Sequence, residues 1–253
     1  MDALIGHTGF VGSNLAAQRT FEANFNSKTI DQIQGREFDT VVCAGVQAQK
    51  WWANQNPEAD WDGIQALIDR LSTVTAKRFV LISTVDVFLP PVGFTERQTD
   101  IDDPGLHAYG KNRLRLEEWV ADHFEMANIV RLPALFGPGL KKNIIFDLMT
   151  DNQVEKIVPN SSFQWYALSR LGADLATVEA QGIDLVQLVP EPLPTQEILT
   201  TFFPDAKVAA PVEPPPSYDL KTEHAAAFGG ANGYIASRDS VLAELGDYLK
   251  GAR

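Results

Sequence analysis

The sequence is poor in cysteine, in basic residues and in long apolar runs, and each shortage excludes a class of protein. Its one cysteine, Cys43, has no partner, so an internal disulfide is impossible. Lys and Arg number 21 against 33 Asp and Glu, which gives a net charge of -12 that a nucleic-acid backbone would repel. No apolar stretch reaches the roughly 18 residues of a membrane span. The strand-like start at residue 2 leaves no room for a signal peptide, so we expect a cytoplasmic protein that binds neither nucleic acid nor membrane.

Cys43 itself is predicted to be a buried small apolar residue. It stands in the apolar run at 41–44, and nothing around it indicates the open, cationic surroundings of a reactive thiol. We predict no metal site.

The order of apolar and amphipathic segments predicts an α/β fold. Apolar runs at 2–6, 40–44, 78–83 and 128–132 are expected to be strands, and helices are expected at 12–20, 64–71 and 108–124. Strands that are apolar throughout must be buried on both faces, which is typical of a parallel sheet covered by helices. Further on, we expect a helix at 144–150, a strand at 183–189 and a helix at 241–249, with extended proline-rich connections at 190–194 and 211–216.

A glycine-rich turn follows the first expected strand and opens a helix. It reads Gly6-His7-Thr8-Gly9-Phe10-Val11-Gly12. Gly6 permits the sharp turn, Gly9 lets the backbone approach a pyrophosphate, and Gly12 allows the helix to pack closely on the strand. The N–H groups of Phe10 and Val11 would then face phosphate, helped by the helix dipole. The alternative is a tight turn without a ligand.

The spacing of these glycines resembles the opening of the extended short-chain dehydrogenase/reductase family, which contains sugar-nucleotide epimerases, dehydratases and reductases. The segment 42–46 is similar to that family's apolar strand ending in small residues, so Ala44 and Gly45 would lie against the adenine ribose. The resemblance covers roughly residues 3–140 and implies a Rossmann-type doubly wound parallel sheet that binds NAD or NADP, with Thr8 also in the coenzyme site. We predict a Rossmann domain at 1–136 and a smaller C-terminal substrate lobe at 137–253, with 183–189 returning to the sheet.

The choice between NAD and NADP depends on the residues after the second strand. Rossmann folds that prefer NAD usually place Asp or Glu there to bind the ribose 2′-hydroxyl. Residues 25–28 read Phe-Asn-Ser-Lys, and the next acid is Asp31. Ser27 and Lys28 could bind a 2′-phosphate, which slightly favours NADP; a solvated surface role for Lys28 is an equal alternative.

The resemblance also implies a catalytic site. Family members carry Ser or Thr at the end of a strand and Tyr-x-x-x-Lys on the next long helix, and the matching residues are Thr84 and Tyr109. Tyr109 would be the acid/base at the substrate oxygen, and Thr84 would hydrogen-bond the same oxygen. A cation four residues after the tyrosine lies on the same helix face and stabilises its phenolate. An inert coenzyme contact or plain packing are the alternatives for Tyr109.

The family's lysine is replaced here by Arg113, and Lys111 cannot take its place because it lies two residues on, roughly on the opposite face. Arginine keeps the charge and could bind ribose hydroxyls, but it cannot release a proton. We therefore expect altered or lost catalysis. A dinucleotide-binding regulatory or scaffold protein is the alternative function.

A second departure narrows the chemistry. Family dehydratases follow the threonine with Asp-Glu, and those positions are Val85 and Asp86 here, so the acid–base pair is incomplete and dehydration is not expected. What remains is reduction, oxidation or epimerisation of a sugar nucleotide or a related hydroxy or carbonyl compound.

The resemblance is faint beyond residue 140. By resemblance, Pro133 and Leu135 would lie beside the nicotinamide, and a homodimer through long helices is possible. Lys141, Lys142 and Arg170 could bind a sugar-nucleotide diphosphate or be solvated surface charges. Trp51 and Trp52 could form a pocket wall or pack in the core or a lid. His107 could reach the active site or be a solvated loop histidine.

Overall fold

A six-stranded parallel sheet forms the centre of the chain. The computed structural model describes residues 1–98 and 105–252. The strands, in the order in which they lie side by side, are β2 (Ala23–Phe25), β1 (Asp2–Ile5), β3 (Glu37–Cys43), β4 (Thr75–Thr84), β5 (Ala127–Leu132) and β9 (Leu185–Gln187), and every neighbouring pair is parallel. The prediction of an α/β fold with a doubly wound parallel sheet is confirmed.

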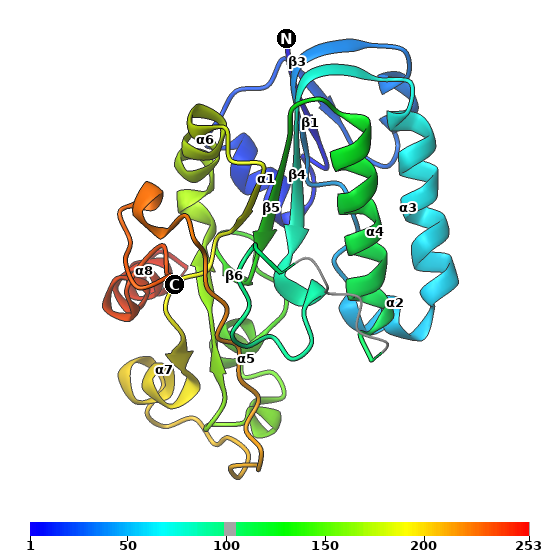
Figure 1. Ribbon diagram of the computed structural model, residues 1–253. Coiled ribbons are helices and arrows are strands. Elements are labelled where there is room, and N and C mark those ends of the chain that lie inside the picture. The colour runs from blue at the N-terminus through cyan, green and yellow to red at the C-terminus, as the bar shows by residue number, and fades with distance from the viewer. Residues whose placement is uncertain (99–104, 253) are drawn as a thin grey trace.

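Helices cover both faces of this sheet (Figure 1). On one face α3 (Pro57–Leu71) packs beside α4 (Ala108–His123), and on the other α1 (Phe10–Ala16) lies beside α6 (Leu171–Gln181). Neighbouring strand residues therefore enter different cores: Leu4 packs with the α6 side, whereas Ala3 and Ile5 pack with the α3 side. This two-sided burial explains why the strands are apolar without alternation.

The remaining elements form a smaller lobe below the sheet in Figure 1. It contains α5 (Ile144–Thr150), α7 (Thr195–Phe202), α8 (Arg238–Gly251), and two short strand pairs: β6 (Ala134–Phe136) with β8 (Trp165–Ala167), and β7 (Ser162–Phe163) with β10 (Leu193–Pro194). Single-turn helices occupy Ile30–Ile33 after β2 and Val85–Val87 after β4, and others follow at Val154–Lys156, Leu168–Arg170 and Ala225–Phe228.

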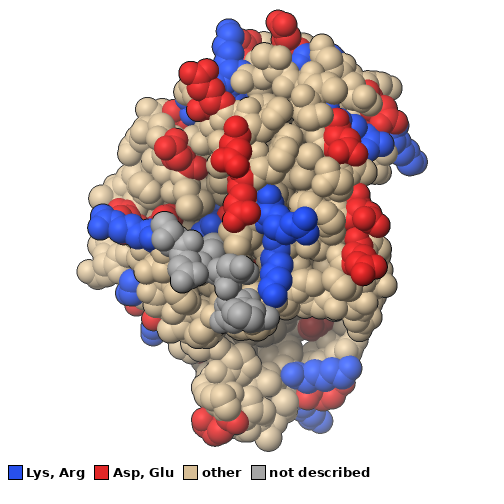
Figure 2. All heavy atoms as spheres, turned by 45° about the vertical axis from the view of Figure 1, so that its right-hand side comes forward, with Lys and Arg blue, Asp and Glu red and all other residues tan. Residues whose placement is uncertain are grey.

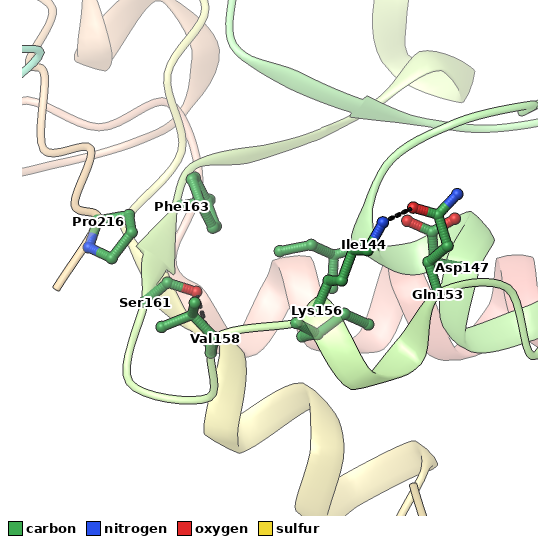
Figure 3. A pocket seen from close by; sticks show the side chains of 9 residues that line it. Ile144, Asp147, Gln153, Lys156, Val158, Ser161, Phe163 and Pro216 are labelled. Atoms are coloured by element: carbon green, nitrogen blue, oxygen red, sulfur yellow. Dashed lines mark hydrogen bonds between the residues drawn. The ribbon is translucent and has the colours of Figure 1, made fainter. Parts of the chain in front are cut away.

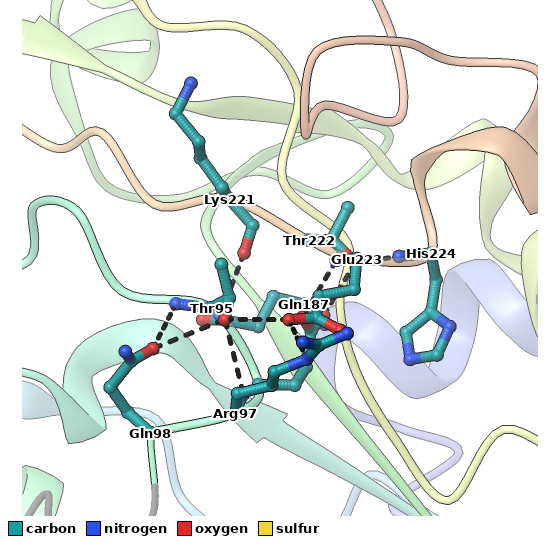
Figure 4. A network of polar contacts seen from close by, with 9 residues as sticks. Thr95, Arg97, Gln98, Gln187, Lys221, Thr222, Glu223 and His224 are labelled. Atoms are coloured by element: carbon teal, nitrogen blue, oxygen red, sulfur yellow. Dashed lines mark hydrogen bonds and ion pairs between the residues drawn. The ribbon is translucent and has the colours of Figure 1, made fainter.

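Glu96 joins the segment that follows β4 to the C-terminal part of the chain, and Figure 4 labels its neighbours Thr95 and Arg97 beside Thr222. Its Oε1 accepts hydrogen bonds from the Gln187 N–H at 2.7 Å and the Thr222 hydroxyl at 2.6 Å, and its Oε2 accepts the Glu223 N–H at 3.1 Å. Arg97 adds an ion pair to Glu223 at 2.5 Å. These contacts hold the strand-like stretch before Thr222 against the end of the sheet, where it contributes to the candidate site described below.

The boundaries of some helices differ from those predicted. The first helix begins at Phe10 instead of residue 12, and α3 begins at Pro57 instead of residue 64, because proline fits the first turn, where its missing N–H is not needed. The helix α2 (Lys50–Gln55) and helices α6 and α7 were not predicted. Gly182, with a left-handed φ of 61° directly after α6, is a helix-end signal that the sequence contained.

Charged side chains are spread over the surface. On the face shown in Figure 2, Lys and Arg lie among Asp and Glu instead of forming one continuous basic area. Within residues 1–98 and 105–252, no helix is long and apolar enough to cross a membrane.

Candidate functional site

The glycine-rich turn has no room for side chains at two of its three glycines. Gly6 has a left-handed φ of 86°, and a Cβ on it would lie 2.4 Å from the Ala44 carbonyl oxygen. A Cβ on Gly12 would lie 2.1 Å from the Gly6 carbonyl oxygen, and one on Gly9 would lie 3.2 Å from that same atom. Gly6 and Gly12 are thus required by backbone packing, whereas Gly9 is exposed and nearly free of contact.

The open side of this turn presents backbone donors. Gly9 is the N-cap of α1, so the amides that follow it in the first turn have no intrahelical acceptor. No acidic residue stands in that first turn to occupy them. The Asn14 side chain fixes the turn from behind, donating to the Phe10 carbonyl and to the Pro138 carbonyl, both at 2.8 Å. A cradle that a Cβ would fill, with unopposed N–H groups, fits a pyrophosphate.

The turn lies where the order of the sheet reverses. The chain goes from β1 to the outer strand β2 and then crosses back to β3, which lies on the other side of β1. Ligands of open α/β sheets bind at such a switch point, outside the carboxyl ends of the strands. Ala44 and Gly45 follow β3 at that same edge, and the Ala44 carbonyl is in contact with Gly6.

No acidic residue directly follows β2. His7 approaches the Phe25 carbonyl with its Nδ1 at 3.0 Å, and Asn26 accepts the Lys28 N–H at 2.9 Å in a tight turn. The Lys28 side chain is exposed. Asp31, the first acid, pairs with Arg70 at 2.6 Å, so its carboxylate already has a cation.

Thr84 and Tyr109 come together at the carboxyl edge of the sheet. Thr84 ends β4, and Tyr109 is the second residue of α4, where its phenol lies near enough to the Thr84 hydroxyl for their interaction to lower the phenol pKa. The Thr84 oxygen also accepts the Asp86 N–H at 3.1 Å. The structure therefore brings these two predicted site residues into contact, although they stand 25 positions apart in the sequence.

Arg113 lies beneath the Tyr109 ring, with its guanidinium carbon 3.9 Å from the ring centroid. Its two terminal nitrogens are bound to the two carboxylate oxygens of Asp60, with one contact at 2.9 Å and one shorter. The same nitrogens also donate to the Gln47 carbonyl at 2.6 Å and to the Tyr109 carbonyl at 3.3 Å. Both partners of this ion pair are buried, each with 4% of its side chain exposed.

These contacts change the role expected for Arg113. The expected contact with ribose hydroxyls would need terminal N–H groups that the structure already shows bound to Asp60 and to backbone carbonyls. Asp60 is one of the residues that could not be predicted from the sequence, because an acid inside a helix, 53 positions from its partner, carries no local signal of pairing.

The pKa of the Tyr109 phenol is raised above its ordinary value. Burial is the largest cause, and the carboxylates of Asp86 and Asp60 act in the same direction, while Arg113 and the hydrogen bond from Thr84 act against them. Without a ligand, Tyr109 is therefore protonated at neutral pH.

A second polar group faces the same region. Asp86 accepts hydrogen bonds at its Oδ1 from the Lys50 ammonium and from the Tyr218 phenol, both at 2.8 Å. Lys50 comes from α2 and Tyr218 from the C-terminal stretch held by Glu96, so neither could be placed here from sequence. Burial and the Asp86 carboxylate raise the pKa of Tyr218, which keeps its phenol a donor.

A cavity of about 250 Å³ lies in the smaller lobe (Figure 3). Its wall combines apolar side chains with a cation and polar groups: Ile144, Asp147, Gln153, Lys156, Ile157, Val158, Ser161, Phe163 and Pro216. The Phe163 ring lies 5.6 Å from the Tyr218 ring, centroid to centroid, so Tyr218 contacts both this cavity wall and Asp86. The cavity and the Thr84–Tyr109 pair are thus linked through two residues, Tyr218 and Asp86.

The other predicted residues have varied surroundings. His107 caps α4 by accepting the Gly110 N–H at 3.0 Å, and burial together with the nearby Lys50 lowers its pKa. Arg170 is held by Asp174 at 3.4 Å and by Glu244 at 3.1 Å, which leaves it a structural ion pair. Lys142 donates to the Ala48 carbonyl, and Trp51 is 62% exposed. Lys141 is exposed and Trp52 partly buried, while Pro133 links β5 to β6 and Leu135 is the middle residue of β6, and both are partly exposed.

Cys43 is fully buried in β3, and burial raises its pKa to about 11. The prediction of a buried thiol is confirmed.

Several solved structures share the fold of this chain. No protein-family profile and no curated sequence match the chain. A dTDP-4-dehydrorhamnose reductase from Clostridium acetobutylicum has a TM-score of 0.74 at 18% identity, over 99% of this chain and 100% of that chain. An NAD-dependent NDP-hexosamine 5,6-dehydratase of tunicamycin biosynthesis has a TM-score of 0.74 at 16% identity, over 100% and 98%. The UDP-glucose 4-epimerase of Thermotoga maritima, solved with UDP-glucose, has a TM-score of 0.73 at 14% identity, over 100% and 99%. Along its whole length, this chain has the fold shared by these sugar-nucleotide reductases, dehydratases and epimerases.

Proposed function

We propose that the chain is a member of the extended short-chain dehydrogenase/reductase family and an NAD(P)-dependent reductase or epimerase of a sugar nucleotide or related carbonyl compound. The observation that supports this most strongly is the contact between Thr84 and Tyr109 at the carboxyl edge of a sheet whose switch point carries the glycine cradle. The shared fold over whole chains adds to it, since similar proteins include reductases, a dehydratase and an epimerase.

In this proposal the cradle holds the coenzyme pyrophosphate on the amides of Phe10 and Val11, beside Thr8, Ala44 and Gly45. A bound nicotinamide coenzyme would give hydride to, or take it from, the carbon whose oxygen faces Tyr109. Tyr109 gives or takes the proton at that oxygen, and Thr84 hydrogen-bonds the oxygen and orients the phenol. Pro133 and Leu135 would hold the nicotinamide end of the coenzyme, and Arg113 fixes the Tyr109 ring from below.

The cavity in the smaller lobe is the proposed site for the nucleotide end of the substrate. Its apolar side chains, including Phe163, suit a base, and the Lys156 ammonium suits a phosphate. A sugar between this cavity and Tyr109 would pass Tyr218 and Asp86, whose oxygens can bind sugar hydroxyls.

For the coenzyme, we propose a preference for NADP. The residues after β2 include no acid free to bind a ribose 2′-hydroxyl, because Asp31 is paired with Arg70, while Lys28 stands exposed. A 2′-phosphate would gain a charge-assisted hydrogen bond from Lys28.

Calorimetric titration with NADPH and NADH, followed by single-turnover absorbance of the nicotinamide, tests the proposal. The probes are dTDP-4-dehydrorhamnose for reduction and UDP-glucose for epimerisation. We expect coenzyme binding and a signal with one probe that Tyr109→Phe removes without loss of binding. Binding with no redox signal or epimerised product, from any sugar-nucleotide probe, would favour the alternative of a dinucleotide-binding regulatory protein, which the pairing of Arg113 with Asp60 also supports.

A further inference from the structure

The cation that should activate Tyr109 is matched by a carboxylate in the same buried site. Arg113 has 4% of its side chain exposed, as does Asp60, and the two meet through both carboxylate oxygens. Asn112 also donates to Asp60, at 2.8 Å, so the carboxylate is held in place by two neighbouring residues of α4. At the Tyr109 phenol, Asp60 therefore offsets part of the effect of Arg113, and together with burial and Asp86 it keeps the phenol pKa raised.

The same holds for the other charges near the phenol. Lys50 is matched by Asp86 at 2.8 Å. The His107 ring lies 6.2 Å from the Tyr109 ring, and its pKa is lowered, so it is neutral at pH 7. The titratable and charged groups that face Tyr109 come from α2, α3, the start and first turns of α4, the turn after β4 and the C-terminal stretch: Lys50, Asp60, His107, Arg113, Asp86 and Tyr218. Each cation in this set has its own carboxylate.

We propose that the Arg113–Asp60 ion pair commits Tyr109 to the role of proton donor, so that the chain is a carbonyl reductase rather than an epimerase. This rests on the proposed function. In the step, Tyr109 breaks its O–H bond and gives the proton to the carbonyl oxygen, while the carbonyl carbon gains hydride from the reduced coenzyme, which leaves oxidised. The resulting phenolate recovers a proton from water. Arg113 is a positioning residue that holds the ring.

An epimerase that begins by oxidising a hydroxyl needs the phenolate as base. With an ordinary tyrosine pKa of about 10, roughly one molecule in a thousand carries it at pH 7, and the surroundings of Tyr109 make that fraction smaller. Reduction uses the protonated form, which is fully populated. The overall equilibrium fixes the ratio of kcat/KM for reduction to kcat/KM for oxidation. The pKa of Tyr109 sets the pH at which each of these constants levels off. We therefore expect kcat/KM for reduction to be constant at neutral pH, and kcat/KM for oxidation to rise about tenfold per pH unit to beyond pH 10.

The decisive experiment follows the ionisation of Tyr109 directly. The protein has five tyrosines, so ring-labelled 13C-tyrosine gives a simple NMR spectrum, and Tyr109→Phe assigns the signal. We expect no titration of Tyr109 below pH 10 in the wild type, with and without NADPH. In Asp60→Asn, which leaves the Arg113 charge unmatched, the midpoint should fall by at least one pH unit. Asp62→Asn, which removes an exposed acid from the same helix, should leave it unchanged.

The two proposals fail separately. A wild-type midpoint below pH 9 overturns this inference, even if Asp60→Asn does not fold, and so does an Asp60→Asn midpoint equal to that of the wild type. Faster epimerisation of UDP-glucose than reduction of dTDP-4-dehydrorhamnose at pH 7 overturns it too. Failure to bind either coenzyme in calorimetry instead overturns the proposed function, whatever the titration of Tyr109 shows.

Discussion

Replacing either Gly12 or Gly9 by alanine adds one methyl group to the same turn, but we expect Gly12→Ala to lower the stability of the fold and Gly9→Ala to lower the affinity for NADPH. In Gly12→Ala the new Cβ would lie 2.1 Å from the Gly6 carbonyl oxygen and 2.7 Å from its carbon. These are backbone atoms, and contacts at van der Waals distance need more than 3 Å, so α1 must move away from β1. In Gly9→Ala the nearest atom is 3.2 Å away, and φ of -80° is one that alanine adopts freely.

The expected magnitudes follow from these distances. Overpacking of this kind costs about 1–3 kcal/mol or more, which for a chain of this size lowers Tm by roughly 2–12 °C in Gly12→Ala. Gly9→Ala loses only a favourable N-cap residue, about 0.5–1 kcal/mol. Its methyl group, however, stands on the exposed side of the cradle, where a pyrophosphate would lie, so NADPH affinity should fall at least tenfold.

Differential scanning fluorimetry and calorimetric titration with NADPH measure both effects. A Gly12→Ala protein with wild-type Tm would show that the close packing of α1 on β1 is not needed. A Gly9→Ala protein with wild-type NADPH affinity would refute the placement of the pyrophosphate over this turn.

Three further variants test other parts of the account. Lys28→Ala should lower the affinity for NADPH by about tenfold, the value of one charge-assisted hydrogen bond, and leave the affinity for NADH unchanged in calorimetry. Equal losses of affinity for both coenzymes would refute the proposed contact between Lys28 and the 2′-phosphate. Arg113→Met should lower the free energy of unfolding by about 3–5 kcal/mol in urea, since it leaves Asp60 buried without a partner, and adding Asp60→Leu should restore most of it. Burial raises the pKa of Cys43 to about 11 in the folded protein, whereas the unfolded thiol ionises near pH 9. The free energy of unfolding of the wild type should therefore fall by about 2–3 kcal/mol between pH 9 and pH 11, and that of Cys43→Ala should fall less.

The sequence was sufficient for the parts of the fold that depend on local pattern. Apolar runs without alternation predicted the parallel strands, and the glycine turn predicted the cradle, because backbone sterics act over a few residues. The pair of Thr84 and Tyr109 was predicted through family spacing, and the structure brings the two side chains together at the carboxyl edge of the sheet.

The partners that define the electrostatics could not be predicted in the same way. Asp60, Lys50 and Tyr218 reach the site from separate elements, and nothing in their own neighbourhoods marks them as charged partners of a tyrosine. The effect of replacing the family's lysine by Arg113 also depends on Asp60, which is 53 positions away, so the residue type alone left the outcome open. Packing of distant segments decides such pairings.

A crystal structure with NADPH bound tests the central claim most directly. The account predicts the pyrophosphate against the amides of Phe10 and Val11, the 2′-phosphate within reach of Lys28, and the nicotinamide between Pro133 and the phenol of Tyr109. A nucleotide bound anywhere other than at the switch point between β1 and β3, or no nucleotide at saturating NADPH, would contradict it.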